Sequence, residues 1–182
     1  MDLSNLPTSL VSQLTGAVEG FIVASRKKYG ANAVPLTPAQ KRAMQPFFSR
    51  EILDQVKVVA LNGSRVEDPP FYAMAKMMGI RNLLSFSEVA AVTFVDIVVS
   101  HEPFSDTLLF HELVHVVQYA QMGSKEFASR YVRGFLKSGS YDEFRWRRTH
   151  TNWSSASIAR ARRFRWLMKY GSGWKREDFS FR

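Results

Sequence analysis

The pattern of apolar and polar residues along the chain predicts mostly helical structure. Residues Thr8 to Lys28 and Ser124 to Lys137 are expected to form helices. A further helix is expected to begin at Thr37-Pro38, because proline is favoured at the first helical position, and Pro46 should end or bend it. A shorter helix is expected from Phe71 to Met78.

Two runs rich in β-branched residues predict short strands. The first extends from Val56 to Leu61 and is closed by the turn residues Asn62-Gly63. The second extends from Ala91 to Ser100, and both runs fit a single small sheet. Together with the helices they place the chain in the α+β class, as a mostly helical domain with a short β-hairpin or small sheet.

A further helix is expected between Ser105 and Met122. Ser105 and Asp106 follow Pro103 and can cap its first turn, and Gly123 follows the last apolar residues as a stop signal. The helix should be buried, so polar side chains on it need partners. It is apolar over much of its circumference, at Leu108, Leu109, Leu113, Val116 and Val117.

This helix carries the sequence His111-Glu112-Leu113-Val114-His115, which has the HExxH spacing. Residues four apart share one face of a helix, so the imidazoles of His111 and His115 can reach one metal ion. Glu112 points beside them and can accept a proton from water activated by the metal. Zinc is the expected ion, His111 and His115 its ligands, and Glu112 the general base. The alternative is a chance occurrence of the motif on a core helix.

The composition of the 182 residues fits a globular protein, with 46% hydrophobic and 13% aromatic residues. The sequence has no cysteine, so a metal ion must be bound by His, Asp or Glu. The basic cluster Arg26-Lys27-Lys28 follows the first apolar stretch, which reverses the order of a secretory signal. No apolar run reaches the length of about 18 residues that a membrane span needs. We expect a soluble, cytoplasmic protein.

Charge is distributed unevenly along the chain. Residues 1–143 contain 14 Lys and Arg and 14 Asp and Glu. Residues 144–182 contain 11 Lys and Arg, only 2 Asp and Glu, and all four tryptophans. We therefore predict an HExxH domain over residues 1–143, followed by a basic segment, residues 144–182. Arginine interleaved with aromatic residues can bind phosphates and stack on bases, or bind an anionic membrane surface.

Residues 108–119, Leu-Leu-Phe-His-Glu-Leu-Val-His-Val-Val-Gln-Tyr, resemble the bacterial zinc-metallopeptidase domains that carry HELxHVVQ. These include the core domains associated with contractile injection systems. The resemblance extends upstream to Ala91 and downstream to Tyr141. It implies a small zincin-like α+β domain that hydrolyses peptide bonds, with the two histidines of the motif as zinc ligands and its glutamate as the general base.

The chain departs from this family after Tyr141. The family usually has a Pro-Leu-Glu segment there, on a helix whose glutamate completes the zinc site, but this chain continues as Phe144-Arg145-Trp146-Arg147-Arg148. One hypothesis is that the basic segment is read out of frame. If reading starts at the third base of the Glu143 codon, permitted codons for Phe144 and the following residues can spell Ile-Pro-Leu-Glu-x-x-Ala-Tyr-Glu-Leu-Glu. A shifted frame of the gene without Pro-Leu-Glu would exclude this. The basic segment is therefore either a selected binding region or an aberrant, poorly ordered one.

A catalytic zinc site usually has three protein ligands and one open position, and only two are assigned above. Glu126 better fits a first-turn carboxylate favoured by the helix dipole, and His101 better fits a loop residue. Gln118 lies near the face of the ligands, where it can hydrogen-bond a group around the metal or make an internal polar contact. The candidates for the third ligand, each of which also fits a solvated surface position, are Glu143, Asp142 and His150.

The expected function is hydrolysis of a peptide bond by metal-activated water, with Glu112 as the base. Two alternatives stay open: an inactive metallopeptidase-like scaffold without a third ligand, and a protein that binds nucleic acid or an anionic surface through residues 144–182. Salt-sensitive nucleic-acid binding that depends on this segment and not on His111 would favour the last. Tyrosines that can assist hydrolysis as proton donors are Tyr119, Tyr131 and Tyr141.

Overall fold

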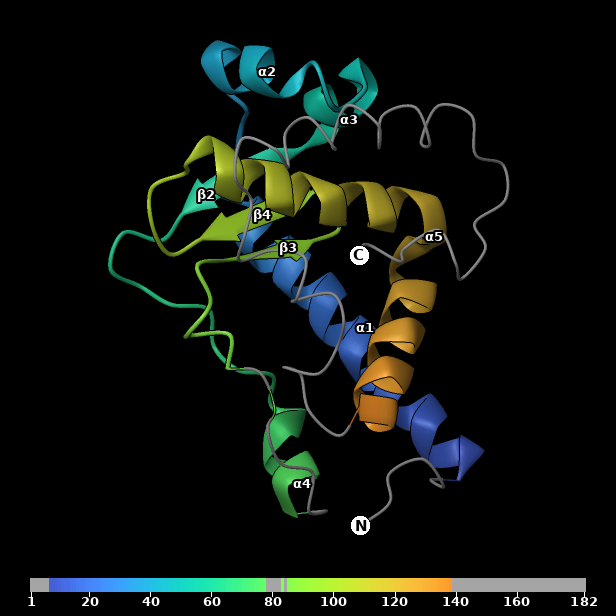
Figure 1. Cartoon of the computed structure of the whole chain (residues 1–182). Helices are drawn as coiled ribbons and strands as arrows, with labels where there is room; N and C mark the ends of the chain where they lie inside the picture. Colours follow the sequence, from blue (N-terminus) through green and yellow to red (C-terminus); the bar gives the residue numbers. More distant parts are fainter. Residues whose placement is uncertain (1–6, 78–82, 84, 139–182) are drawn as a thin grey trace.

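The computed structural model describes residues 7–77, 83 and 85–138 (Figure 1). These residues have α+β structure, as the sequence predicts, and the expected helices from Thr8, Pro38 and Phe71 are present. The expected end of the third of these, at Met78, lies outside the described residues. The elements in chain order are α1 (Thr8–Gly30), β1 (Val34–Pro35), α2 (Pro38–Met44), α3 (Arg50–Gln55), β2 (Lys57–Ala60), α4 (Phe71–Met77), β3 (Ala91–Phe94), β4 (Ile97–Ser100) and α5 (Asp106–Ser138).

The described strands form one sheet with the order β1-β2-β4-β3. β2, which matches the first predicted strand, is a parallel neighbour of β4, with Val58 opposite Val98. β1 pairs with β2, and β3 with β4, in the antiparallel direction. All four residues of β4 are buried, as expected for a strand covered on both faces.

The prediction of one strand from Ala91 to Ser100 is wrong, because this run folds into the hairpin β3–β4. Phe94 pairs with Ile97 across a turn formed by Val95 and Asp96. Val95 has a positive φ of 62°, which a β-branched residue rarely adopts. The Asp96 carboxylate accepts two hydrogen bonds from the Arg26 guanidinium on α1, at 2.5 and 2.8 Å. A distant helix thus supports a turn that lacks the usual Asn-Gly signal.

The core lies on both faces of the sheet, with α5 on one face and α1 on the other (Figure 1). Val98 of β4 belongs to the same buried cluster as Leu109 and Leu113 of α5. The next residue, Val99, belongs to the cluster that contains Tyr29 of α1. Because successive side chains of a strand point to opposite faces, the apolar run of β4 supports both helices.

Helix α5 changes direction at Gly123, which has a φ of 74° and a ψ of 169°. The predicted stop is confirmed, and a second helical part follows it directly, as Figure 1 shows. This second part packs along α1, where Ser124 Oγ donates a hydrogen bond to Glu19 at 2.9 Å. The bend therefore lets α5 cover first the sheet and then α1. Its residues in the shared core with α1 include Ala128, Val132 and Leu136.

Helix α2 begins as predicted, because Thr37 and Gln40 form a reciprocal capping box, and it ends before Pro46. Helix α3 was not expected. It begins after Ser49, whose Oγ accepts a hydrogen bond from the Ile52 N–H at 3.4 Å. With six residues, α3 is too short to show a helical period in the sequence.

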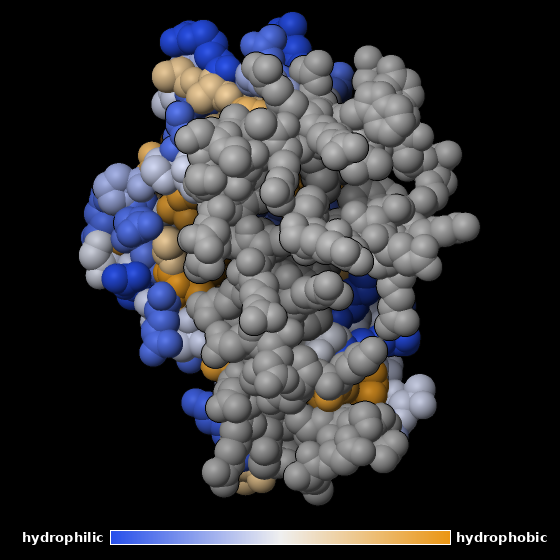
Figure 2. Space-filling model, viewed as in Figure 1, coloured by the Kyte–Doolittle hydropathy of each residue, from blue (hydrophilic) through white to orange (hydrophobic). Residues whose placement is uncertain are grey.

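At the top of the view, over α2 and α3, Figure 2 shows hydrophilic residues together with a pale orange, more apolar group. Exposed residues there include Arg42, Arg50, Glu51 and Asp54.

Among the helices of the described residues, none combines the length and apolar character required to cross a lipid bilayer.

Candidate metal and catalytic site

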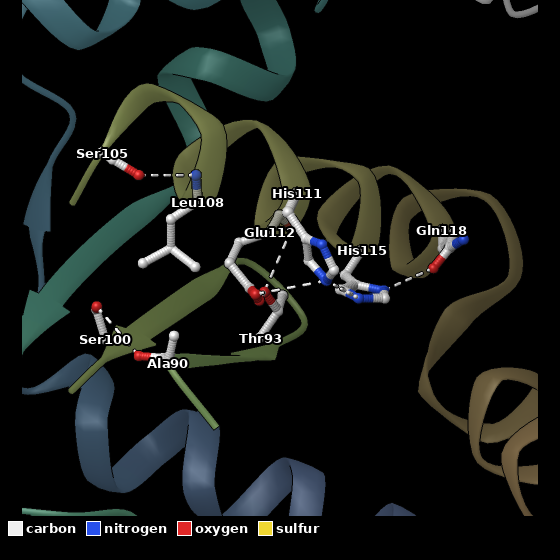
Figure 3. A network of polar contacts seen from close by, with 9 residues as sticks. All are labelled: Ala90, Thr93, Ser100, Ser105, Leu108, His111, Glu112, His115 and Gln118. Atoms are coloured by element: carbon white, nitrogen blue, oxygen red, sulfur yellow. Dashed lines mark hydrogen bonds and ion pairs between the residues drawn. The ribbon is translucent and has the colours of Figure 1, made fainter. Parts of the chain in front are cut away.

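The HExxH residues lie on the first part of α5, which crosses the sheet (Figure 3). This helix begins where predicted, since the Leu108 N–H donates to Ser105 Oγ at 3.1 Å. Leu109 and Leu113 are fully buried, whereas the side chain of His111 is 28% exposed. The apolar side of the helix thus fixes it on the sheet, and the histidine side stays partly accessible to solvent.

The imidazoles of His111 and His115 project from the same side of α5 and face each other (Figure 3). Their Nε2 atoms are 3.2 Å apart. In a tetrahedral site with zinc–nitrogen bonds of about 2.0–2.1 Å, two nitrogen ligands lie about 3.3–3.4 Å apart. The two histidines therefore have a separation that suits two ligands of one zinc ion.

Glu112 is buried between α5 and the sheet, with only 4% of its surface exposed. Its Oε2 accepts a hydrogen bond from Thr93 Oγ1 on β3 at 2.6 Å, and its Oε1 lies 3.8 Å from His111 Nε2. Burial raises the pKa of the Glu112 carboxyl. The hydrogen bond from Thr93 opposes this rise, as does the positive charge that His115 carries when it is protonated. A carboxyl with a raised pKa is suited to accepting and returning a proton.

Thr93 is a site residue that the sequence analysis did not identify. It is buried on β3 and reaches Glu112 across 19 positions of sequence. A signal was nevertheless present, because Thr93 carries the only hydroxyl within the run Ala91-Val92-Thr93-Phe94. A buried hydroxyl needs a hydrogen-bond partner, although the sequence does not say which one.

Gln118 lies one turn beyond His115 on the same side of the helix (Figure 3). Its Oε1 is 2.9 Å from His115 Nδ1. The polar contact predicted for Gln118 is therefore present, and it is made to one of the two predicted ligands. The other ring nitrogen of His115 is the one that faces His111.

The third ligand predicted for the site is not found among the residues that the structure describes. Within them, no three or more His, Cys, Asp or Glu side chains gather closely enough to hold a metal ion. Glu126 is instead paired with Arg130 at 2.7 Å, in the first turn after Gly123, as its predicted helix-dipole role requires. Candidates that lie outside the described residues are Asp142, Glu143 and His150.

His101 connects two loops, as expected for a loop residue. Its Nε2 accepts a hydrogen bond from the Val66 N–H at 2.9 Å, and its Nδ1 lies 2.6 Å from the Val89 carbonyl oxygen. Because a carbonyl can only accept, Nδ1 carries the hydrogen. Both nitrogens are engaged with backbone, so His101 has a structural role.

Tyr119, one of the candidate proton donors, is buried and stacked on Phe127, with ring centroids 3.9 Å apart. Burial raises the pKa of its hydroxyl, and Tyr131 and Glu112 raise it further. The hydroxyl of Tyr119 therefore stays protonated at neutral pH and can donate a hydrogen bond. Tyr141 lies outside the described residues.

Comparisons of the chain with protein-family models, curated proteins and solved structures found no match. The resemblance to the HELxHVVQ domains therefore depends on residues 108–119 and their surroundings. What the structure adds is the arrangement of four side chains, two facing imidazoles, a buried carboxyl and an amide.

Proposed function

We propose that the chain is a zinc-dependent metallopeptidase of zincin-like fold, in which His111 and His115 bind the metal and Glu112 is the general base. The observation that carries this proposal is the distance of 3.2 Å between the two Nε2 atoms, with Glu112 Oε1 3.8 Å from one of them. A pair of metal ligands and a proton acceptor are thus within reach of one water molecule.

A bound zinc ion supplies Lewis acidity, which polarises a water molecule and the carbonyl group of a peptide. Glu112 accepts the proton of the attacking water and returns it to the leaving amine. Thr93 holds Oε2 of this carboxyl, so Oε1, which lies on the side of His111, is the oxygen directed to the water. Burial of Glu112 favours this exchange because it raises the pKa of the carboxyl.

A catalytic zinc site requires a third protein ligand besides His111 and His115. We propose that a residue outside the described part of the chain supplies it, from the candidates Asp142, Glu143 and His150. All three follow the second part of α5 in sequence. Replacing each one singly, by Asn for Asp142 and His150 and by Gln for Glu143, identifies the ligand as the variant that loses zinc.

Zinc content of the purified full-length protein tests the proposal. We expect about one zinc per chain by elemental analysis, and none in a His111→Ala/His115→Ala variant. Glu112→Gln should keep the zinc and lose peptide hydrolysis, because the amide cannot accept the proton. Hydrolysis by Glu112→Gln at the rate of the unchanged protein would exclude the mechanism.

An inactive scaffold is the second candidate function, because no third ligand occurs among the described residues. In that case the facing histidines hold zinc weakly, since each missing ligand reduces affinity, and the protein acts through its surface. A folded full-length protein that contains no zinc, even after dialysis against a solution of zinc, would favour this candidate over hydrolysis.

A further inference from the structure

The two ring nitrogens of His115 have different neighbours. Nδ1 lies 2.9 Å from Gln118 Oε1, and Nε2 lies 3.2 Å from His111 Nε2. An amide oxygen can only accept a hydrogen bond, so Nδ1 must carry the hydrogen in this contact. A neutral imidazole carries one N–H, which leaves the lone pair of His115 on Nε2.

We propose that Gln118 is a positioning residue that fixes His115 in the Nδ1–H tautomer and so directs its Nε2 lone pair toward a divalent metal ion. The proposal rests on the proposed function in one respect, the assignment of His115 as a ligand. Residues 115 and 118 are three apart on one helix, so the geometry of α5 itself brings the amide to the ring.

The same argument determines the hydrogen on His111 in the metal-free protein. Because His115 Nε2 carries a lone pair, the contact of 3.2 Å between the two Nε2 atoms requires His111 Nε2 to be the donor. The hydrogen bonds then run in one direction along the helix, from His111 to His115 and from His115 to Gln118. Only His111 has to change its tautomer when a metal binds, because His115 already presents a lone pair.

The orientation of the Gln118 amide decides between two opposite arrangements. With Oε1 toward the ring, His115 is a preformed ligand. With the amide turned by half a rotation, its NH₂ group would donate to Nδ1, and Nε2 would carry the hydrogen instead. The tautomer of His115 in solution is therefore a direct test of the proposal, and it requires no metal and no substrate.

The first experiment is long-range ¹H–¹⁵N correlation NMR of the metal-free, full-length protein at about pH 8, where unperturbed imidazoles are neutral. Signals are assigned with His111→Asn and His115→Asn variants. We expect a protonated Nδ1 on His115 and a protonated Nε2 on His111. A protonated Nε2 on His115 would overturn the proposal, and so would an unchanged His115 spectrum in Gln118→Met, which removes the acceptor at similar length.

The second experiment measures the affinity of the same proteins for Zn²⁺ and Co²⁺. Loss of a hydrogen bond to a ligating histidine reduces metal affinity about 10- to 100-fold, and we expect this loss in Gln118→Met. Gln118→Glu, which keeps an acceptor oxygen, should restore the affinity and the His115 tautomer. The matched control is Gln13→Met, at an exposed position of helix α1, and it should bind as the unchanged protein does.

The two experiments separate failure of this inference from failure of the proposed function. An unchanged protein that binds neither ion would contradict the zinc site, but the NMR spectrum would still decide whether Gln118 sets the tautomer of His115. Equal metal affinity of Gln118→Met and the unchanged protein would overturn the positioning role while leaving the zinc site intact.

Discussion

At the residue scale, Glu112 illustrates how a carboxyl is kept inside an apolar core. Taking an ionised carboxylate out of water costs on the order of several kcal/mol unless it is paired or hydrogen-bonded. Here Thr93 donates to Oε2, and the positive charge that His115 carries when it is protonated favours the ionised form. These two groups oppose the effect of burial, which still dominates and raises the pKa.

Replacing Thr93 therefore tests the support of this carboxyl. Thr93→Val keeps the shape of the side chain and removes the donor, so the free energy of unfolding should fall by about 1–3 kcal/mol. Thr93→Ser keeps the hydroxyl and should lose less than the valine variant. Urea unfolding at neutral pH measures both, and equal stability of Thr93→Val and the unchanged protein would contradict the role of this hydrogen bond.

Asp54 gives a pH dependence that is independent of the candidate site. A hydrogen bond from Lys41 Nζ, at 2.5 Å, and the charges of Lys41 and Arg50 lower the pKa of its carboxyl. A lowered pKa contributes stability that is present above the unfolded value of about 3.9 and is lost as the pH falls through the folded pKa.

Thermal unfolding of Asp54→Asn and the unchanged protein between about pH 7 and pH 3 measures this contribution. The unchanged protein should be the more stable of the two at neutral pH, and the difference should shrink as the pH falls below the unfolded pKa. A difference that stays constant over this range would show that Lys41 does not act on the charge of Asp54.

Part of the candidate site could be predicted from spacing alone. His111, Glu112 and His115 lie within one helical turn and a half, so their proximity follows from the helix period. Gln118 lies on the same stripe, which made a contact with this site predictable but not its partner atom. Thr93 lies on a strand, and only the packing of β3 against α5 brings it to Glu112.

At the element scale, the helices with clear end signals were the predictable ones. Thr37 and Ser105 cap helices where the sequence predicts them, and Gly123 interrupts α5 where a stop was expected. The hairpin β3–β4 was not predictable, because both its strands are apolar and Val95 stands at a turn position with positive φ. Its support comes from Arg26, 70 positions earlier in the chain.

Gly123 provides a matched pair of variants with Gly20. The backbone of Gly123, with a φ of 74° and a ψ of 169°, lies in a region that is essentially restricted to glycine, and other residues there cost about 1–3 kcal/mol. Gly20 lies within the regular helix α1, where alanine is favoured over glycine by about 0.5–1 kcal/mol. Beyond the adjacent backbone, a side-chain Cβ would meet no atom of the described residues within 4 Å at either position, so backbone conformation determines both effects.

We expect Gly123→Ala to lower the free energy of unfolding and Gly20→Ala to raise it, as measured by urea unfolding. Opposite signs would establish that the bend of α5 is imposed by the backbone of Gly123. Two variants that shift stability in the same direction would contradict this explanation. A straightened α5 would also disturb the packing of its second part on α1.

At the scale of the whole molecule, the fold class could be predicted but the order of the strands could not. Parallel pairing of β2 with β4 places the hairpin at one edge of the sheet, and no local pattern encodes this choice. The predicted boundary at residue 143 lies outside the described residues, so the division into two segments stays a prediction. It rests on composition, since residues 144–182 account for the whole net charge of +9.

The basic segment leads to a prediction that is separate from the zinc site. It contains eleven Lys and Arg, two Asp and Glu and four tryptophans. We expect it to bind single-stranded nucleic acid through phosphate contacts and stacking. Fluorescence anisotropy with a single-stranded oligonucleotide should then show affinity that falls steeply as salt rises, because bound phosphates release counterions.

The full-length His111→Ala/His115→Ala variant should bind equally well, whereas deletion of residues 144–182 should abolish binding. Salt-independent binding, or binding that survives the deletion, would show that the basic segment does not supply the contacts, and the aberrant-frame hypothesis would then explain its composition better.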